Sequence, residues 1–153
     1  MSLYLEDVHA GEIFESPRRT VSLEDILAFA RSFDPQPFHL DVEAAKATFF
    51  GRLVGSGWHT AALTMLMMTE ALDFAGGLIG MGMEDLRWPA PLLPGDTIHL
   101  HAEVVQVRAS QSRPKSGIAR IDVRTVREDG AVLQQMIANV LMPRHPDHVS
   151  LVE

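Results

Sequence analysis

The sequence predicts an α+β domain in which an antiparallel sheet wraps one long apolar helix. Residues 58–74 are rich in Ala, Leu and Met, and their apolar side chains surround the helix instead of forming one stripe, which is typical of a buried element. Further along the chain, residues 97–104 and 118–126 alternate between apolar and polar side chains, as half-buried strands do. An antiparallel meander of this kind covers one of its faces with a helix.

Length and composition narrow the class of protein. A chain of 153 residues fits one domain, and 46% hydrophobic with 22% charged residues is typical of a folded protein. The net charge of -7 argues against nucleic-acid binding. The absence of cysteine excludes disulfides and thiolate chemistry. The first residues lack a secretory pattern, and the apolar segment 61–68 is too short to span a bilayer, so we expect a soluble, cytoplasmic protein.

The helices of the first half carry recognisable start and stop signals. Ser22 can cap a helix over residues 23–33, because Asp25 stands three residues later as in a capping box. Prolines stop that helix after residue 33. Asp41 can cap a second, short helix that follows them.

The second half predicts the strands of the sheet. We expect strands over residues 97–104, 118–126 and 132–141, another around 84–88 and one near 12–20, with turns at 94–96 and 128–130 and an irregular tail over 143–153. A sheet packed on one helix leaves an edge strand exposed, and pairing of two copies through that edge is a common remedy. We therefore expect a homodimer or a higher homo-oligomer.

One segment combines groups suited to acid–base chemistry. "DPQPFHLD" places Asp34 and His39 five residues apart, and Pro35 and Pro37 are expected to hold the backbone between them extended. An acid–base reaction needs one group that takes a proton and another that gives one. Gly57 precedes the apolar helix, where a backbone N–H without a partner could receive a ligand oxygen as an oxyanion hole does. Each feature alone is typical of a turn, whereas their order along the chain favours a site.

Three stretches resemble the MaoC-like dehydratases, a family that includes the (R)-specific enoyl-CoA hydratases. They are "DPQPFHLD", "GRLVGSGWHTAAL" and "EDLRWPAPLLPGD", and the resemblance extends from about Gly11 to Leu141. It implies the hotdog fold, with Asp34 and His39 as the catalytic pair and the N–H of Gly57 as the group that receives the thioester oxygen. The chain departs from the family pattern in two places, where Gln36 replaces an Asn and Ser56 replaces a His.

The resemblance implies a hydratase or dehydratase of 2-enoyl and 3-hydroxyacyl thioesters, with no metal or redox cofactor. Coenzyme A enters only as part of the substrate, and an acyl carrier protein is the other possible carrier. Two alternatives stay open. An acyl-CoA thioesterase would need a carboxylate acting near the central helix, and Glu70 and Asp73 lie too far along that helix. A non-catalytic acyl-thioester-binding protein on the same fold is the second, because Gln36 and Ser56 depart from the pattern.

Further residues are candidates for contact with the substrate. Gln36 and Ser56 lie beside the catalytic candidates, and His59 lies in the first turn of the apolar helix, where it either packs in the interior or lines the pocket. The candidates for binding coenzyme A phosphates are Arg87, Arg108, Arg113, Lys115 and Arg120, with "SRPKSG" as the favoured loop. His99 and His101 share one face of a strand without a third ligand nearby, so we expect no metal site.

Overall fold

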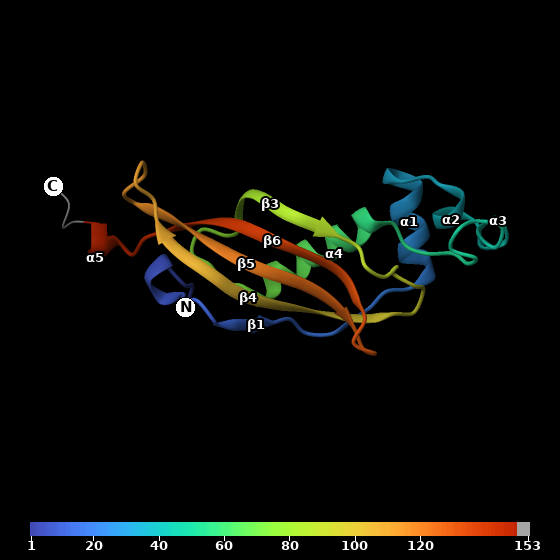
Figure 1. Cartoon of the computed structure of the whole chain (residues 1–153), viewed down its shortest axis with the longest axis horizontal. Coiled ribbons are helices and arrows are strands. Elements are labelled where there is room, and N and C mark those ends of the chain that lie inside the picture. Colours follow the sequence, from blue (N-terminus) through green and yellow to red (C-terminus); the bar gives the residue numbers. More distant parts are fainter. Residues whose placement is uncertain (150–153) are drawn as a thin grey trace.

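The computed structural model describes residues 1–149 of the chain (Figure 1). Its strands are β1 (Ile13–Glu15), β2 (Arg19–Thr20), β3 (Ile79–Arg87), β4 (Thr97–Ala109), β5 (Ser116–Arg127) and β6 (Val132–Pro143). Its helices are η1 (Leu5–Asp7), α1 (Leu23–Phe33), α2 (Pro37–Leu40), α3 (Val42–Ala45), α4 (Gly57–Ala71) and α5 (Pro146–Val149). No helix among these residues is long and apolar enough to cross a membrane.

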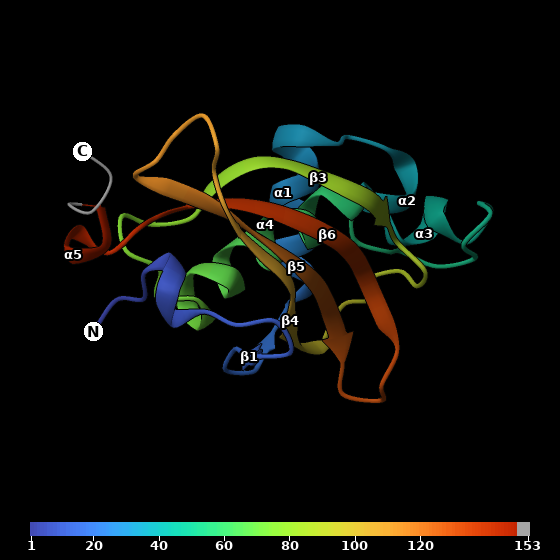
Figure 2. The ribbon, with the colours of Figure 1, turned by 60° about the vertical axis from the view of Figure 1, so that its left-hand side comes forward.

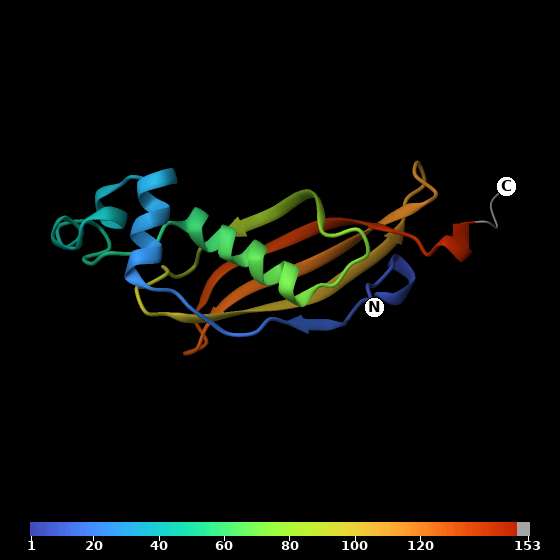
Figure 3. The same ribbon diagram turned by 180° about the vertical axis from the view of Figure 1, so that it is seen from behind.

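The strands form one antiparallel sheet in the order β1-β4-β5-β6-β3, and β2 also pairs with β4. In the centre of the sheet, Ile121 of β5 lies opposite Val104 of β4 and Ala138 of β6. The sheet curves around α4, which lies against its inner face (Figure 3). The predicted α+β architecture is therefore confirmed, with β3 at one edge of the sheet.

The alternation read from the sequence explains which side of the sheet is buried. Ile98, Leu100 and Ala102 of β4 point inward and are fully buried, together with Ile121 and Val123 of β5. They form one cluster with Met67 and Met68, which face the sheet from α4. The period of two in the strands thus supplies one wall of the core, and a single side of α4 supplies much of the other.

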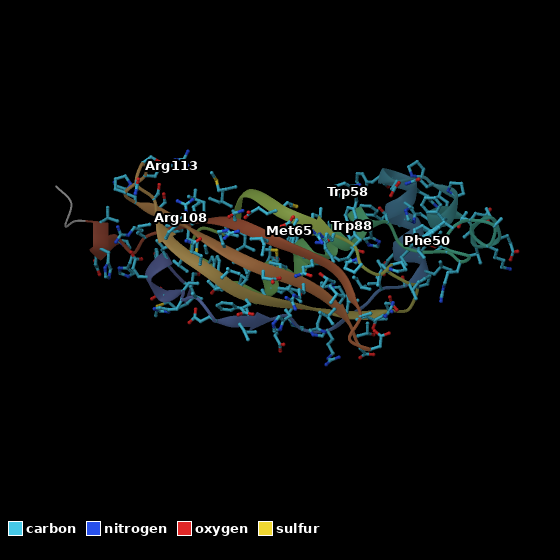
Figure 4. All side chains as sticks on the ribbon, viewed as in Figure 1. Phe50, Trp58, Met65, Trp88, Arg108 and Arg113 are labelled. Atoms are coloured by element: carbon cyan, nitrogen blue, oxygen red, sulfur yellow. The ribbon has the colours of Figure 1, made fainter. Side chains whose placement is uncertain are left out.

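The opposite side of α4 differs from the prediction of a wrapped helix. Trp58, Met65 and Leu66 are 58%, 42% and 43% exposed, so an apolar stripe of α4 faces outward (Figure 4). One sheet contacts one side of a helix, and a helix that is apolar all round needs a second apolar surface to cover the remainder. Met81 and Met83 of the edge strand β3 are also exposed.

Several element boundaries also differ from those predicted. Helix α4 ends at Ala71 instead of residue 74, and β3 begins at Ile79 instead of residue 84. Gly80 and Gly82 conceal the first part of β3 in the sequence, and the pairing with β6 shifts register between them. The expected strand near 12–20 is divided into β1 and β2. The expected irregular tail contains the short helix α5, and its last residues, 150–153, lie outside the described part.

Candidate active site

Asp34 owes its position to the end of α1. The helix begins with the predicted capping box, in which Ser22 and Asp25 exchange hydrogen bonds of 3.1 Å. Asp34 is the residue after the last turn, and its N–H donates to the carbonyl of Ala30 over 3.0 Å. Its carboxylate therefore projects from the point where the chain leaves the helix.

A single helical turn brings His39 back toward Asp34. Gln36 is extended, as a residue before proline should be, but Pro37 occupies the first position of α2. The expectation of an extended backbone from Asp34 to His39 is therefore wrong for its second half. A proline can occupy the first position of a helix without loss of a hydrogen bond, and Pro37 does so. As a result, Nε2 of His39 lies 3.3 Å from Oδ2 of Asp34.

The other ring nitrogen of His39 fixes the position of its proton. Nδ1 lies 2.7 Å from the carbonyl oxygen of Val54. A carbonyl oxygen only accepts hydrogen bonds, so Nδ1 carries the hydrogen and Nε2 of the neutral ring offers a lone pair. The N–H of Val54 in turn donates to the carbonyl of Phe38 over 3.0 Å, which ties the two segments together. The ring is held in place and only 5% exposed.

Two side chains hold the carboxylate of Asp34. The hydroxyl of Ser56 donates to Oδ2 over 2.6 Å, and Nε2 of Gln36 donates to Oδ1 over 2.6 Å. Partial burial by itself raises the pKa of Asp34, but the two hydrogen bonds, together with the positive charge that His39 carries when it is protonated, outweigh it and lower the pKa below its usual value. Both departures from the family pattern thus donate to the ionised form of the same carboxylate.

The start of α4 forms the other side of the site. Ser56 caps the helix by accepting a hydrogen bond of 3.2 Å from the N–H of Trp58. No acceptor within residues 1–149 pairs with the N–H of Gly57. A Cβ on Gly57 would stand 2.8 Å from two ring atoms of Trp88. Trp88 is held in this place by a hydrogen bond of 2.9 Å from its Nε1 to Oε1 of the buried Gln134.

A cavity of about 420 Å³ opens beside these groups. His39 and Gly57 line it together with Thr60, and the rest of its wall is almost entirely apolar. The wall consists of Phe38, Phe49, Phe50, Val54, Gly55, Trp88, Pro89, Ala90, Pro91 and Leu92. Asp34 does not line the cavity itself and reaches it through its contact with His39. Such a space suits an apolar group attached to a polar one.

His59 does not line this cavity. It lies on another side of α4, where its ring stacks on Phe29 of α1 at 4.7 Å between centroids. Its burial lowers the pKa of His59, while the charge of Asp25 acts in the opposite direction. The structure therefore places His59 between two helices and away from the group formed by Asp34 and His39.

The predicted cationic contacts also lie outside the cavity. Arg87 is the last residue of β3. Its side chain is 75% exposed, and its Nη2 lies 3.9 Å from Oδ1 of Asp85. Arg113 and Lys115 belong to the turn between β4 and β5, and Figure 4 shows Arg113 at the end of the molecule opposite to Phe50 and Trp88. Neither Arg113 nor Lys115 lines the cavity of its own chain.

Two contributors were missed in the sequence. Trp88 stands in the quoted stretch "EDLRWPAPLLPGD", but only the fold shows that its ring covers Gly57. Val54 acts through its backbone carbonyl, and a backbone carbonyl is present in every residue, so no sequence signal could identify it.

The chain matches the model of the MaoC-like domain family over residues 7–127. It therefore belongs to the MaoC-like domain family. The match includes the segment of Asp34 and His39, the start of α4 and the stretch that contains Trp88.

Individual relatives support this membership. The MaoC-like dehydratase from Rhodospirillum rubrum has a similar crystal structure, with 44% identity, a TM-score of 0.91, and coverage of 95% of this chain and 99% of that one. An (R)-hydratase from A. caviae is 27% identical with a TM-score of 0.74, covering 90% of this chain and 99% of the other. The 3-hydroxybutyryl-CoA dehydratase of Methylorubrum extorquens is 28% identical over 74% of this chain and 71% of its own. The fold is the hotdog fold.

Proposed function

We propose that this protein is an enoyl-CoA hydratase or acyl dehydratase, which adds water to 2-enoyl thioesters or removes it from 3-hydroxyacyl thioesters. The observation that carries the proposal is the pair formed by Asp34 and His39, 3.3 Å apart, beside an apolar cavity and the N–H of Gly57, which has no acceptor in the described part of the chain. The similarity to an (R)-hydratase and to a 3-hydroxybutyryl-CoA dehydratase supports the same class of reaction.

The acid–base pair suits the activation of water. Nε2 of His39 and Oδ2 of Asp34 both accept hydrogen bonds, so one water molecule can donate a hydrogen to each. The oxygen of this water bonds to Cβ of the enoyl group while one of its O–H bonds breaks, and the proton passes to the pair. Delivery of a proton from the pair to Cα then yields the 3-hydroxyacyl thioester. Dehydration follows the same steps in reverse.

The N–H of Gly57 suits the charge that develops on the substrate. Attack at Cβ moves electrons toward the thioester carbonyl, whose oxygen becomes negative. An N–H at a helix start can donate to this oxygen, and the helix dipole favours a negative charge there. The loss of such a donor typically costs about 3 kcal/mol of transition-state stabilisation.

Hydration of crotonyl-CoA tests the proposal directly. The purified protein should remove the absorbance of the enoyl thioester, and Asp34→Asn and His39→Ala should each slow this loss by a factor of about 10²–10⁴. Circular dichroism should show the same fold in both variants. Retention of full activity in both variants would contradict the assignment of these two residues.

The two alternative functions, a thioesterase and a non-catalytic binding protein, would give different experimental results. A thioesterase would release free thiol from an acyl-CoA, but Glu70 is held by Arg19 at 2.6 Å and Asp73 accepts from Ser2 at 2.9 Å. Neither carboxylate lines the cavity. A non-catalytic binding protein would bind an enoyl-CoA tightly without turnover. The hydrogen bonds of Ser56 and Gln36 to Asp34 favour the enzyme, because they keep the carboxylate ionised and oriented.

We also propose that the protein acts as a homodimer in the cytoplasm. The free edge of β3 and the exposed stripe of α4 support a second copy as the missing cover, because they combine unpaired strand groups with apolar side chains. The lack of cysteine fits a reducing compartment. Light scattering coupled to gel filtration should give twice the mass of one chain, and Met83→Asp should reduce it to that of a monomer.

A further inference from the structure

The hydroxyl group of Thr60 has no hydrogen-bond partner among residues 1–149. The backbone of the same residue is hydrogen-bonded, since its N–H donates to the carbonyl of Ser56 over 3.1 Å and its carbonyl accepts from Oγ1 of Thr64 over 2.8 Å. The chain has six other threonines, and the hydroxyl of each is hydrogen-bonded: Thr20 to Thr97, Thr48 to Ala45, Thr64 to Thr125 and Thr69 to Leu66. Thr60 is therefore the exception in this part of the chain.

This hydroxyl faces the cavity. Thr60 is only 2% exposed, and the open space that it lines is the cavity beside His39. The side-chain nitrogen and oxygen atoms that are enclosed without a partner in residues 1–149 are Nε of Arg19, Nδ1 of His59 and Nδ1 of His99. Oγ1 of Thr60 is not among them, so it keeps contact with the open space of the cavity.

The position of Thr60 on α4 relates its hydroxyl to the acyl chain. Thr60 follows Gly57 by three residues, and residues three apart share one side of a helix. They are separated by about 4.5 Å along the axis of α4, because each residue adds 1.5 Å. Helix α4 begins beside α1 and runs from there along the sheet (Figure 2), so Thr60 lies further under the sheet than Gly57. With the thioester oxygen at the N–H of Gly57, the hydroxyl of Thr60 lies beside the acyl chain, a few atoms beyond the carbonyl.

The rest of the cavity wall limits what this hydroxyl can bind. Within residues 1–149, no Arg, Lys, Asp or Glu lines the cavity. A carboxylate on the acyl chain would be buried there without a cationic partner, which is strongly unfavourable. A plain alkyl chain would displace water and leave the hydroxyl of Thr60 without any partner, which is unfavourable as well. A neutral oxygen atom on the acyl chain avoids both penalties, because it accepts a hydrogen bond from the hydroxyl.

We propose that Thr60 selects acyl chains that carry a neutral oxygen atom, in a carbonyl or a hydroxyl group, near their fourth carbon. The proposal rests on the function proposed above, since the place of the acyl chain follows from the thioester oxygen at Gly57. Thr60 then distinguishes oxygenated from purely aliphatic acyl groups. It binds the substrate and takes no part in the proton transfer, which Asp34 and His39 perform.

Calorimetric titration with two saturated thioesters of matched shape tests this selection. One ligand, 4-oxopentanoyl-CoA, has a carbonyl oxygen on the fourth carbon, where the other, 4-methylpentanoyl-CoA, has a methyl group. Thr60→Val replaces the hydroxyl by a methyl group of similar size. It should lower the preference for the oxo compound, measured as the ratio of the two dissociation constants, by about tenfold. The ratio cancels any effect of the substitution that both ligands share.

Three further variants control the comparison. Thr60→Ser keeps the hydroxyl and should keep most of the preference, whereas Thr60→Ala removes the hydroxyl and should lower the ratio as Thr60→Val does. Thr64→Val is the matched control one turn further along α4, because Thr64 is buried and does not line the cavity, so its ratio should equal that of the wild type. An unchanged ratio in both Thr60→Val and Thr60→Ala, or an equal fall in Thr64→Val, would overturn the proposal.

The titration also separates this selection from the proposed enzymatic function. Neither ligand has a carbon–carbon double bond, so its binding does not depend on turnover. Binding with the expected ratios but without hydration of crotonyl-CoA would contradict only the enzymatic function. Hydration of crotonyl-CoA with ratios that do not respond to Thr60 would contradict only the selection. Absence of binding by both thioesters would contradict the two together.

Discussion

The hydroxyl of Ser56 donates a hydrogen bond of 2.6 Å to Oδ2 of Asp34 while its oxygen accepts one of 3.2 Å from the N–H of Trp58. One side chain therefore joins the carboxylate of the site to the first turn of α4. Any movement of the helix start is transmitted to Asp34, and a change at Ser56 affects both the stability of the helix and the pKa of the carboxyl group.

Ser56→Ala should lower the free energy of unfolding by about 1 kcal/mol, because α4 loses its cap. It should also raise the pKa of Asp34, because one hydrogen bond to the ionised form disappears. The acidic limb of the kcat/KM profile for crotonyl-CoA should then move to higher pH. Ser56→Thr, which keeps the hydroxyl, is the control. Identical pH profiles for the two variants would show that the hydroxyl does not act on Asp34.

Gly57→Ala should reduce both stability and activity. The new methyl group would stand 2.8 Å from ring atoms of Trp88, so the ring must move away from Gln134. Overpacking of this kind typically costs about 1–3 kcal/mol. Chemical unfolding measures the loss, and Trp88→Phe combined with Gly57→Ala should recover part of the stability. Equal midpoints for Gly57→Ala and the wild type would contradict the contact between residue 57 and the indole.

His59 should make the protein less stable in mild acid. Burial lowers the pKa of His59 in the folded chain, whereas the unfolded chain binds a proton near the ordinary value of about 6.5. The unfolded state therefore holds more protons below that pH, and stability falls as the pH decreases. Urea unfolding at about pH 7.5 and about pH 5.5 measures this loss. His59→Phe keeps the stacking on Phe29 and should show a smaller loss; an unchanged loss would assign it to other groups.

Gly117→Ala should be among the most destabilising substitutions in the sheet. A Cβ at this position would lie 2.5 Å from the backbone oxygen of Arg108 and would also overlap the side chain of the buried Leu5. Backbone on one side leaves no room for adjustment, so we expect a loss of about 2 kcal/mol. Thermal unfolding is the measurement, with Ser116→Ala as the neighbouring control that should change stability by much less.

Local patterns predicted most of the fold. The capping box of Ser22 and the alternation in β4 and β5 reflect interactions within a few residues, which the sequence displays directly. The start of β3 was missed because Gly80 and Gly82 resemble a loop. The exposed stripe of α4 was missed for a different reason: an apolar periodicity tells which faces avoid water, but not whether the same chain covers them.

The site was predictable only in part. The spacing of Asp34 and His39 suggested a pair, and the structure brings the two side chains together. The extended geometry expected between them was wrong, since Pro37 begins a helical turn. The placement of His59 against Phe29 depends on how α1 packs on α4, and the distance of Arg113 from the cavity depends on the length of the sheet. Both are properties of tertiary structure that residue spacing does not contain.

The packing of Trp88 over Gly57 also gives the protein a natural optical signal. The chain has two tryptophans, and the ring of Trp58 meets that of Trp88 edge to face at 5.1 Å between centroids. Both indoles therefore lie at the start of α4, and Trp88 lines the cavity. Intrinsic fluorescence should consequently be enough to detect the entry of a ligand, without a dye or an engineered label. In the Trp88→Phe variant, the emission should no longer respond to a bound acyl group.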